Sequence, residues 1–336
     1  MTTVRLPYRY ASVTVDGSFD RDAVGACLRD WFITCAENLT GAWWQDVQAC
    51  QPLPSALGEF HSLTGRDGPA HVEVVPGAAV AYVSIMQPFT KDMSAWTEAV
   101  CTAESWEVFL ERLGELPSTA AMEFVQYGPD GAQVPRSAPS ITATFSDPYR
   151  RWLTLTLMIP GDHIVGSPQM QRAVREQLRA FCGRWPVTYA EVSASAGPQA
   201  TAFEQLYPYR PPTASYPSWA GPSLSELARH DIERSRTWLR GYSWVTAFAP
   251  ELADRFGGTQ QLREQGAFVD VQQLDNGVCW LVATERYEDY GWPEAERVFE
   301  ALAPGLPAGI PHPPDRADPE PFIVRRDASD LHPGAT

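Results

Sequence analysis

Ser243 has the most enzyme-like setting in the chain, within the run Gly241-Tyr242-Ser243-Trp244-Val245. A nucleophile elbow follows the pattern Gly-x-Ser-x-Gly and places its serine on a sharp turn between a strand and a helix. Here Val245 stands where the second glycine is required, and the β-prone run continues to Phe248 instead of turning into a helix. We therefore expect no nucleophilic serine at this position.

Metal and phosphate binding find little support in the sequence. The histidines are scattered, and none has a second ligand at a helix or strand spacing that suits zinc. Gly257-Gly258 follows a predicted helix and lacks the Lys-Ser/Thr ending of a phosphate-binding loop, so it is typical of a helix C-cap. We expect no metal, no cofactor and no catalytic residue. The six histidines are His61, His71, His163, His230, His312 and His332.

Three carboxylates and two tyrosines follow a predicted buried strand, at its exposed end. Two carboxylates in such a place could act as general acid and base. They could equally form an acidic, aromatic recognition patch, because tyrosine gives binding energy at low entropic cost. A plain solvated loop is the third interpretation. The residues are Glu285, Tyr287, Glu288, Asp289 and Tyr290, and we select the first four as candidate partner-binding residues.

A second candidate surface is the Tyr- and Pro-rich connector at residues 207–222. Aromatic rings are costly to leave in water without a purpose. They either pack across the domain or form a docking surface. Tyr216 and Trp219 are the candidate partner-binding residues of this connector.

Composition narrows the classes of partner. The chain has 336 residues and a net charge of −15. Nucleic acid is an unsuitable partner, because phosphate binding needs a basic face. An acidic protein suits either plain solubility or a basic protein partner. Without a secretory segment, a long apolar run or paired cysteines, the sequence predicts a cytoplasmic protein that has no membrane partner and keeps its six cysteines reduced.

The first half of the sequence predicts strands and helices in mixed order. Apolar alternation predicts a strand at 8–15, and Asp20 begins a helix with an apolar stripe. An aromatic loop containing Trp43 and Trp44 follows. Further predicted elements are strands at 71–75 and 79–86, a helix with an apolar stripe from Trp96 to Leu113, and a strand at 121–127.

The second half repeats that mixture. Pro250 suits the first position of a helix, so residues 242–248 are expected to be extended and a short helix to begin at Pro250. Asn276-Gly277 predicts a hairpin turn between two strands. The other predicted elements are strands at 141–145, 152–157 and 187–192, a helix with its apolar side from Met170 to Cys182, and the helix Trp292–Leu302.

These elements predict an α+β fold with mainly antiparallel sheets flanked by helices. A Gly- and Pro-rich break at 128–140 separates an N-terminal unit, 1–135, from a C-terminal unit, 140–305, and an extended or disordered tail, 306–336. The two halves share an order of elements, which favours duplicated tandem units. The alternative explanation of this shared order is coincidence between two generic α+β layouts.

Residues 237–290 resemble the type VI secretion immunity-like family, a bacterial domain of unknown function. The resemblance rests on Gly241-Tyr242-Ser243-Trp244, on LADRFGG at 252–258 with Leu262 after it, and on the two strands that follow. The family has glycine and proline before an aspartate after its last strand, where this chain has Thr284-Glu285-Arg286. The resemblance implies an immunity protein that neutralises a toxic effector by binding, and it transfers no functional residue.

The sequence therefore predicts a non-enzymatic protein-binding module, an immunity protein whose partner is a basic toxin. An enzyme that uses a carboxylate site and an accessory part of a larger assembly are the two alternatives. The identity of the partner and the oligomeric state do not follow from the sequence.

Overall fold

The computed structural model divides the chain into two compact units. Unit 1 is Met1–Asp16 with Gly161–Thr336, and unit 2 is Gly17–Pro160. The residues that the structure describes are 8–18, 20–49, 61–62, 77, 79–87, 96–134, 137–145, 151–194, 200–206, 232–309 and 322–332.

The sheet of unit 2 is antiparallel throughout its described pairs. Its strands lie in the order β7-β6-β5-β3-β4-β2. Alternating burial along β6 shows one face of that strand turned to the core, as its apolar alternation predicts. The strands are β2 (His61–Ser62), β3 (Ala79–Met86), β4 (Trp96–Val100), β5 (Thr119–Gln126), β6 (Ser140–Phe145) and β7 (Trp152–Pro160).

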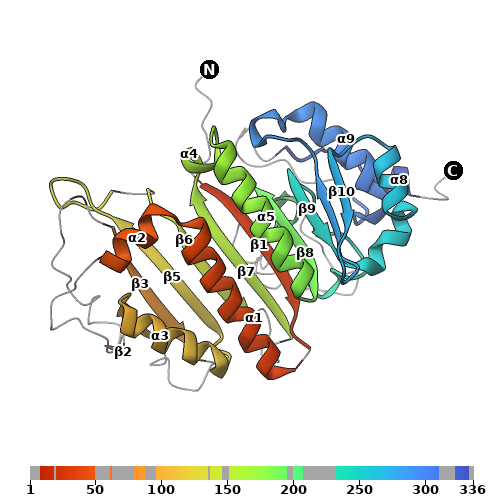
Figure 1. The fold of residues 1–336 in the computed structure, drawn as a ribbon. Helices are drawn as coiled ribbons and strands as arrows, with labels where there is room; N and C mark the ends of the chain where they lie inside the picture. The colour runs from red at the N-terminus through yellow and green to blue at the C-terminus, as the bar shows by residue number, and fades with distance from the viewer. Residues whose placement is uncertain are drawn as a thin grey trace, which may run out of the picture. The chain divides into compact units, whose positions relative to one another are not determined.

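The α-helices in the described part of unit 2 are α1 (Arg21–Ile33), α2 (Ala42–Ala49) and α3 (Ala103–Arg112). Both α2 and α3 contact β3 (Figure 1). Aromatic rings join the helices to each other. Phe32 meets Phe109 edge-on at 4.9 Å between ring centroids, and Trp44 meets Trp106 in the same way at 5.1 Å. Such contacts add to the free energy of burying the rings.

The sheet of unit 1 is also antiparallel, in the order β10-β11-β9-β8-β1. Every residue of β8 is buried. The strand therefore has no solvent face, and its polar side chains must find partners inside the unit. The strands are β1 (Tyr8–Asp16), β8 (Val187–Ser193), β9 (Val245–Phe248), β10 (Asp270–Gln273) and β11 (Cys279–Val282).

The helices of unit 1 begin and end where local chemistry requires. The hydroxyl of Ser167 accepts from the backbone N–H of Met170 at 3.3 Å, and Pro168 occupies the first helical position of α5. Gly257, with φ of +70°, ends the 3₁₀ helix η4 (Pro250–Phe256). The α-helices are α4 (Gly161–Ile164), α5 (Pro168–Arg184), α6 (Ala202–Leu206), α8 (Gly258–Glu264) and α9 (Trp292–Leu302).

The structure confirms the α+β class, the antiparallel pairing of the strands and most elements that lie in the described residues. Helix Trp292–Leu302 has the predicted limits. Gly257 ends a helix as predicted, whereas Gly258 begins the next helix, α8. Asn276-Gly277 lies in the turn between β10 and β11. The predicted strand at 71–75 falls outside the described residues. The duplication of the units stays a prediction.

Two predicted elements are wrong. Trp43 and Trp44 lie in α2 rather than in a loop, because both rings and Val47 share one buried helical face. Residues 96–100 form β4 rather than the start of a helix, because they pair with β3. Helix α3 begins only after Thr102, whose hydroxyl accepts from the N–H of Ser105 at 3.1 Å.

The compact units do not coincide with the segments 1–135 and 140–305. The N-terminal strand β1 pairs with β8, which places it in unit 1. Strands β6 and β7 continue the sheet of β5 and belong to unit 2. Within the expected tail, residues 322–332 pack on unit 1: Ile323 is buried, and the Val324 N–H donates to the Tyr242 hydroxyl at 2.7 Å.

The cysteines in the described part of the chain are buried and unbonded to one another, as predicted for reduced thiols. They are Cys27, Cys35, Cys101, Cys182 and Cys279. None of the helices in the described ranges combines the length and the apolar character that a membrane span requires.

Two glycine-to-alanine changes in unit 1 should have opposite effects on stability. A Cβ on Gly241 would lie 2.9 Å from Phe203 Cβ, so Gly241→Ala should lower the free energy of unfolding by about 1–3 kcal/mol. At Gly183, in the last turn of α5, a Cβ would meet only Leu274 Cδ1 at 3.9 Å. Gly183→Ala should raise stability by up to about 1 kcal/mol through helix propensity. Urea unfolding of both variants measures the two effects, and equal shifts would contradict this packing.

Candidate functional site

The predicted partner-binding residues Glu285 to Asp289 lie in one loop of unit 1, residues 284–291, between β11 and α9. We call it the acidic loop. Its beginning is fixed by Trp244, whose indole Nε1 donates to the carbonyl of Thr284 at 2.9 Å. Its end is fixed by the Gly291 N–H, which donates to Glu294 Oε2 at 3.2 Å. The two ends of the loop are therefore tied to elements that are themselves packed.

Tyr287 turns inward from the acidic loop. It is buried, and its ring meets the Trp244 indole edge-on at 5.4 Å between centroids. The guanidinium carbon of Arg9 lies 4.9 Å from the centroid of the same ring, within cation–π range. Tyr287 thus supports the loop from inside the unit and is not the exposed aromatic anchor that the sequence suggested.

Gln171, on α5, holds the middle of the acidic loop. Its side-chain oxygen accepts from the backbone N–H of Tyr287 at 3.0 Å. Its amide nitrogen donates to the two carboxylate oxygens of Glu288 at 3.1 and 3.0 Å and to the carbonyl of Ile164 at 3.0 Å. Gln171 is itself buried, so its hydrogen bonds to Tyr287 and Ile164 are shielded from water, whereas those to Glu288 are only partly shielded.

Glu288 is engaged within the unit. Its carboxylate also accepts from the backbone N–H of Gly166 and lies 3.5 Å from Arg286. Burial raises the pKa of Glu288, but the hydrogen bonds from Gln171 and the backbone, with the charge of Arg286, outweigh it and hold this pKa below its ordinary value. A general acid needs the opposite shift. The arrangement therefore suits a fixed anion, not a proton donor.

Three other side chains of this region face the solvent. The Glu285 side chain is 74% exposed, with its carboxylate 3.7 Å from Arg175, and Asp289 is exposed. Trp292, the first residue of α9, is 48% exposed and meets the ring of Phe322 at 5.5 Å. Sequence reasoning missed Trp292 as a surface residue, because it continues the apolar stripe of α9 by one turn and so resembles a core position.

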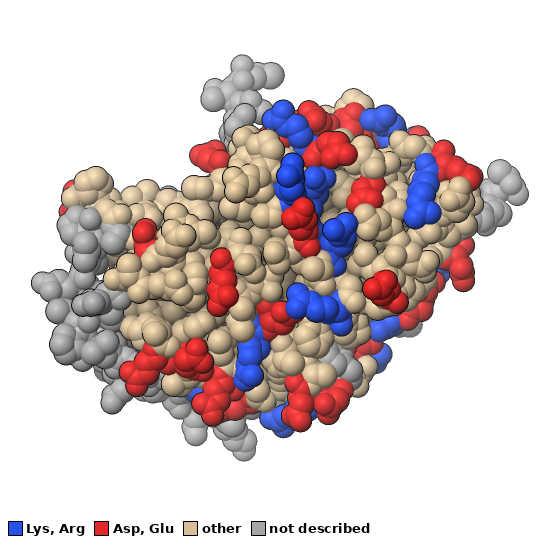
Figure 2. Space-filling view, in the orientation of Figure 1, with Lys and Arg blue, Asp and Glu red and all other residues tan. Residues whose placement is uncertain are grey.

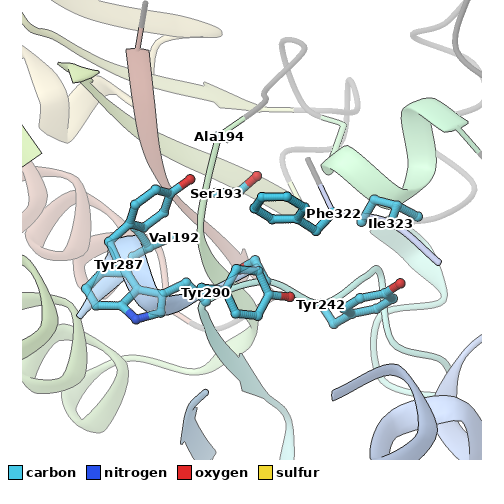
Figure 3. Close-up of a pocket in the computed structure, with 10 residues that line it drawn as sticks. Val192, Ser193, Ala194, Tyr242, Tyr287, Tyr290, Phe322 and Ile323 are labelled. Carbon is cyan, nitrogen blue, oxygen red and sulfur yellow. The ribbon is translucent and has the colours of Figure 1, made fainter. Parts of the chain in front are cut away.

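A small aromatic pocket lies on the inner side of the acidic loop (Figure 3). Tyr290 lies between Tyr287 and Tyr242 in this view. The hydroxyl of Tyr290 is buried and has no hydrogen-bond partner among the described residues. The pocket has room for about one water molecule, which would satisfy this hydroxyl. Its lining residues are Val192, Ser193, Ala194, Tyr242, Ser243, Trp244, Tyr287, Tyr290, Phe322 and Ile323.

A buried charged pair, which the sequence analysis did not single out, lies elsewhere in unit 1. Arg240 and Glu204 form two hydrogen bonds of 2.7 Å, and both side chains are buried. The signal in the sequence is Thr201-x-x-Glu204, a capping box at the start of α6. Glu204 Oε2 accepts from the Thr201 N–H at 2.8 Å, and the Thr201 hydroxyl accepts from the Glu204 N–H at 3.1 Å.

Glu191 lies on β8 near this pair and accepts from the Tyr189 hydroxyl at 2.8 Å. Burial raises the pKa of Glu191 to about 8, with the Glu204 charge adding to the rise and the Tyr189 hydrogen bond and Arg240 opposing it. Such a pKa would suit an acid–base group. Glu191 is only 2% exposed, however, so no substrate reaches it in this conformation.

On the outer side of the acidic loop, Glu285 lines an open groove between α5 and the β10–β11 hairpin. We call it the arginine groove, because α5 contributes Arg172, Arg175 and Arg179 to it. Sequence reasoning considered only the apolar side of this helix.

The other predicted candidates, Tyr216 and Trp219, lie outside the described residues. In the described ranges, no three His, Cys, Asp or Glu side chains gather as a metal site.

Comparison with known proteins leaves the family open. No protein-family model and no curated protein matches the chain. A solved structure described as "Pseudomonas aeruginosa T6SS protein PA0821" aligns with 97% of this chain and 81% of its own length, at 10% sequence identity and a TM-score of 0.48. A likeness at that level supports no conclusion about this chain. The resemblance of residues 237–290 to the immunity-like family stays a hypothesis.

Stability should depend on pH through Glu191. The unfolded chain releases this proton near the ordinary glutamate pKa, whereas the folded chain keeps it up to about pH 8. The folded state therefore binds more protons in that interval, and stability falls as pH rises through it, by at most about 1.4 kcal/mol per pH unit. Glu191→Gln should remove this slope in urea unfolding between about pH 5 and 8. Glu176→Gln, at an exposed position, is the control, and an unchanged slope in Glu191→Gln would contradict the assignment.

Removing Gln171 should loosen the acidic loop. Gln171→Ala leaves the Tyr287 N–H and the Glu288 carboxylate without their buried partner, which costs about 1–3 kcal/mol. Amide hydrogen exchange should accelerate at Tyr287 and its neighbours more than in β8. Gln177→Ala, on the same helix, should leave this exchange unchanged. Equal protection of the loop in both variants would show that Gln171 does not hold it.

Proposed function

We propose that this protein is a non-catalytic protein-binding module, an immunity protein that neutralises a toxin by binding it. The acidic loop and Trp292 form the contact face. The observation that carries the proposal is that some side chains of the loop are held by the rest of unit 1 while others are free to contact a partner. Tyr287 and Glu288 are held from inside by Arg9, Trp244 and Gln171, while Glu285 and Asp289 remain at the surface.

A loop held in this way suits binding for an energetic reason. Association of two proteins is weakened by every side chain or loop that must be ordered on contact. Here the carbonyl of Thr284 and the backbone N–H groups of Tyr287 and Gly291 are already hydrogen-bonded before a partner arrives. Less of the interaction energy would then be needed to order the loop on binding.

The exposed residues supply the two kinds of contact that interfaces use. Exposed carboxylates on a protein with a net charge of −15 would attract a basic partner and speed the encounter. Tryptophan is among the residues enriched at the energetic centres of interfaces. Trp292 is supported on one side by Phe322, so its ring is presented in a defined orientation.

The test uses purified toxins encoded by genes adjacent to that of this protein. Wild-type protein should bind one of them and restore growth to cells that express it. Trp292→Ala should weaken binding about 30-fold or more, as expected for a central aromatic contact. The double variant Glu285→Arg/Asp289→Arg should mainly slow association, and the loss should shrink at high salt.

A charge-matched control is Asp254→Arg/Glu264→Arg, which changes two exposed carboxylates on η4 and α8 by the same amount. It should bind like the wild type if the acidic loop is the contact face. Equal loss in both double variants would show a general charge effect. If the substitutions of Trp292, Glu285 and Asp289 all leave toxin binding and protection of cells intact, the proposed contact face is wrong.

A further inference from the structure

The arginine groove is a second surface feature, of opposite chemical character to the acidic loop. It has a volume of about 300 Å³. Pockets for small organic ligands of that size are lined mainly by apolar groups, whereas this lining is mainly charged. In Figure 2, basic side chains gather over the stretch where Figure 1 places α5, with acidic ones among them. The residues that line the arginine groove are Arg172, Arg175, Glu176, Arg179, Val269, Asp270, Gln272, Trp280, Val282 and Glu285.

The three arginines follow one side of α5, because positions i, i+3 and i+7 share a helix face. Arg172 is exposed and makes no ion pair or hydrogen bond with any described residue. Arg179 donates only a long hydrogen bond, 3.4 Å, to the side-chain oxygen of Gln272. Arg175 has a carboxylate at 3.7 Å, that of the largely exposed Glu285. These guanidinium groups therefore keep donors that a ligand can use.

On the opposite wall of the groove, formed by β10, the carboxylate is held by a neighbouring side chain. Both carboxylate oxygens of Asp270 accept from the amide of Gln272 at 3.0 Å. Gln272 thus links Asp270 to Arg179 and fixes the floor of the groove. Asp270, Glu176 and Glu285 together offset the charge of the three arginines. A uniform polyanion such as nucleic acid would meet these carboxylates and be repelled, whereas a few well-spaced acidic groups would not.

Spacing favours an extended segment. Arg172 and Arg179 are about 10 Å apart along the helix axis, from a rise of ~1.5 Å per residue. A segment in the extended polyproline II conformation has three residues per turn and advances ~3.1 Å per residue, so carboxylates three positions apart lie on one side of it and roughly match this distance. Guanidinium groups recognise carboxylates through paired hydrogen bonds.

We propose that the arginine groove binds an extended acidic segment of the partner protein, with two carboxylates three residues apart placed on Arg172 and Arg179. This deepens the proposed function and rests on it. The partner would meet the acidic loop with basic side chains and the neighbouring groove with acidic ones. Glu285 occupies Arg175 in the free protein and would be displaced or shared when the segment enters.

The probe is a labelled peptide that favours the polyproline II conformation, Ser-Pro-Glu-Pro-Pro-Glu-Pro-Ser, measured against the purified full chain at low salt by fluorescence anisotropy and by the side-chain Nε–H signals of arginine. Arg172→Ala/Arg179→Ala should weaken binding at least about fivefold. Arg184→Ala/Arg297→Ala, which removes equal charge outside the groove, should change it less than twofold. The isosteric peptide with both Glu replaced by Gln should not bind.

Glu285→Gln separates this inference from the proposed function. It removes the competing carboxylate beside Arg175, so it should strengthen binding of the acidic peptide about twofold or more, while weakening binding of a basic toxin to the acidic loop. Weaker peptide binding in Glu285→Gln would overturn the inference. So would equal binding of the Gln peptide, equal loss in both arginine pairs, or tighter binding of a single-stranded oligonucleotide. Loss of toxin binding alone, with the peptide results intact, would contradict the proposed function only.

Discussion

The ion pair between Arg240 and Glu204 is the interaction on which the arrangement of unit 1 depends. Both groups are buried, so either one without the other would leave an uncompensated charge in the interior, which costs about 3–5 kcal/mol. The pair fixes the segment that enters β9. Tyr242 and Trp244 follow at once along the chain. Tyr242 accepts from the C-terminal segment, and Trp244 holds both the start of the acidic loop and the ring of Tyr287.

Helix α5 positions much of the surface of unit 1 described above. The buried side of this helix carries Gln171, which fixes the acidic loop, and its outer side carries the three arginines. One helix thus positions both the acidic loop and a groove in which arginine and carboxylate side chains are mixed. Functional groups on helices are held more precisely than groups on free loops. The exposed Glu285 joins the two surfaces through its contact with Arg175.

Local signals in the sequence predicted much of the fold. Apolar alternation located β6, and helical spacing of apolar residues located α5. Pro250 and Gly257 located the two ends of the short helix η4. Pairing between distant strands was not predictable, because one sequence carries no record of which strand is a neighbour. Residues 96–100 therefore resembled a helix, although they pair with β3.

For the candidate site, only the position of the acidic loop along the chain was predictable. The end of a buried strand followed by carboxylates and tyrosines correctly indicated a loop at 284–291. Which side chains turn inward depends on residues far away in the sequence. Tyr287 is covered by Arg9 and Trp244, and Glu288 is held by Gln171. No local pattern in the sequence predicts that Tyr287 is buried or that, of the three exposed carboxylates, Glu288 is the one held by Gln171.

The pairing of β1 with β8 has a consequence for how the chain is made. Tyr10 lies opposite Ser193, so β1 is synthesised well before β8 and cannot form this pairing until residues 187–193 have been made. Contacts of such long sequence separation form slowly. Until then β1 is an open strand edge, the kind of surface that invites wrong pairing. Unit 2 is continuous in sequence and is complete first, so the nascent chain carries a folded middle between two halves of an unfinished sheet.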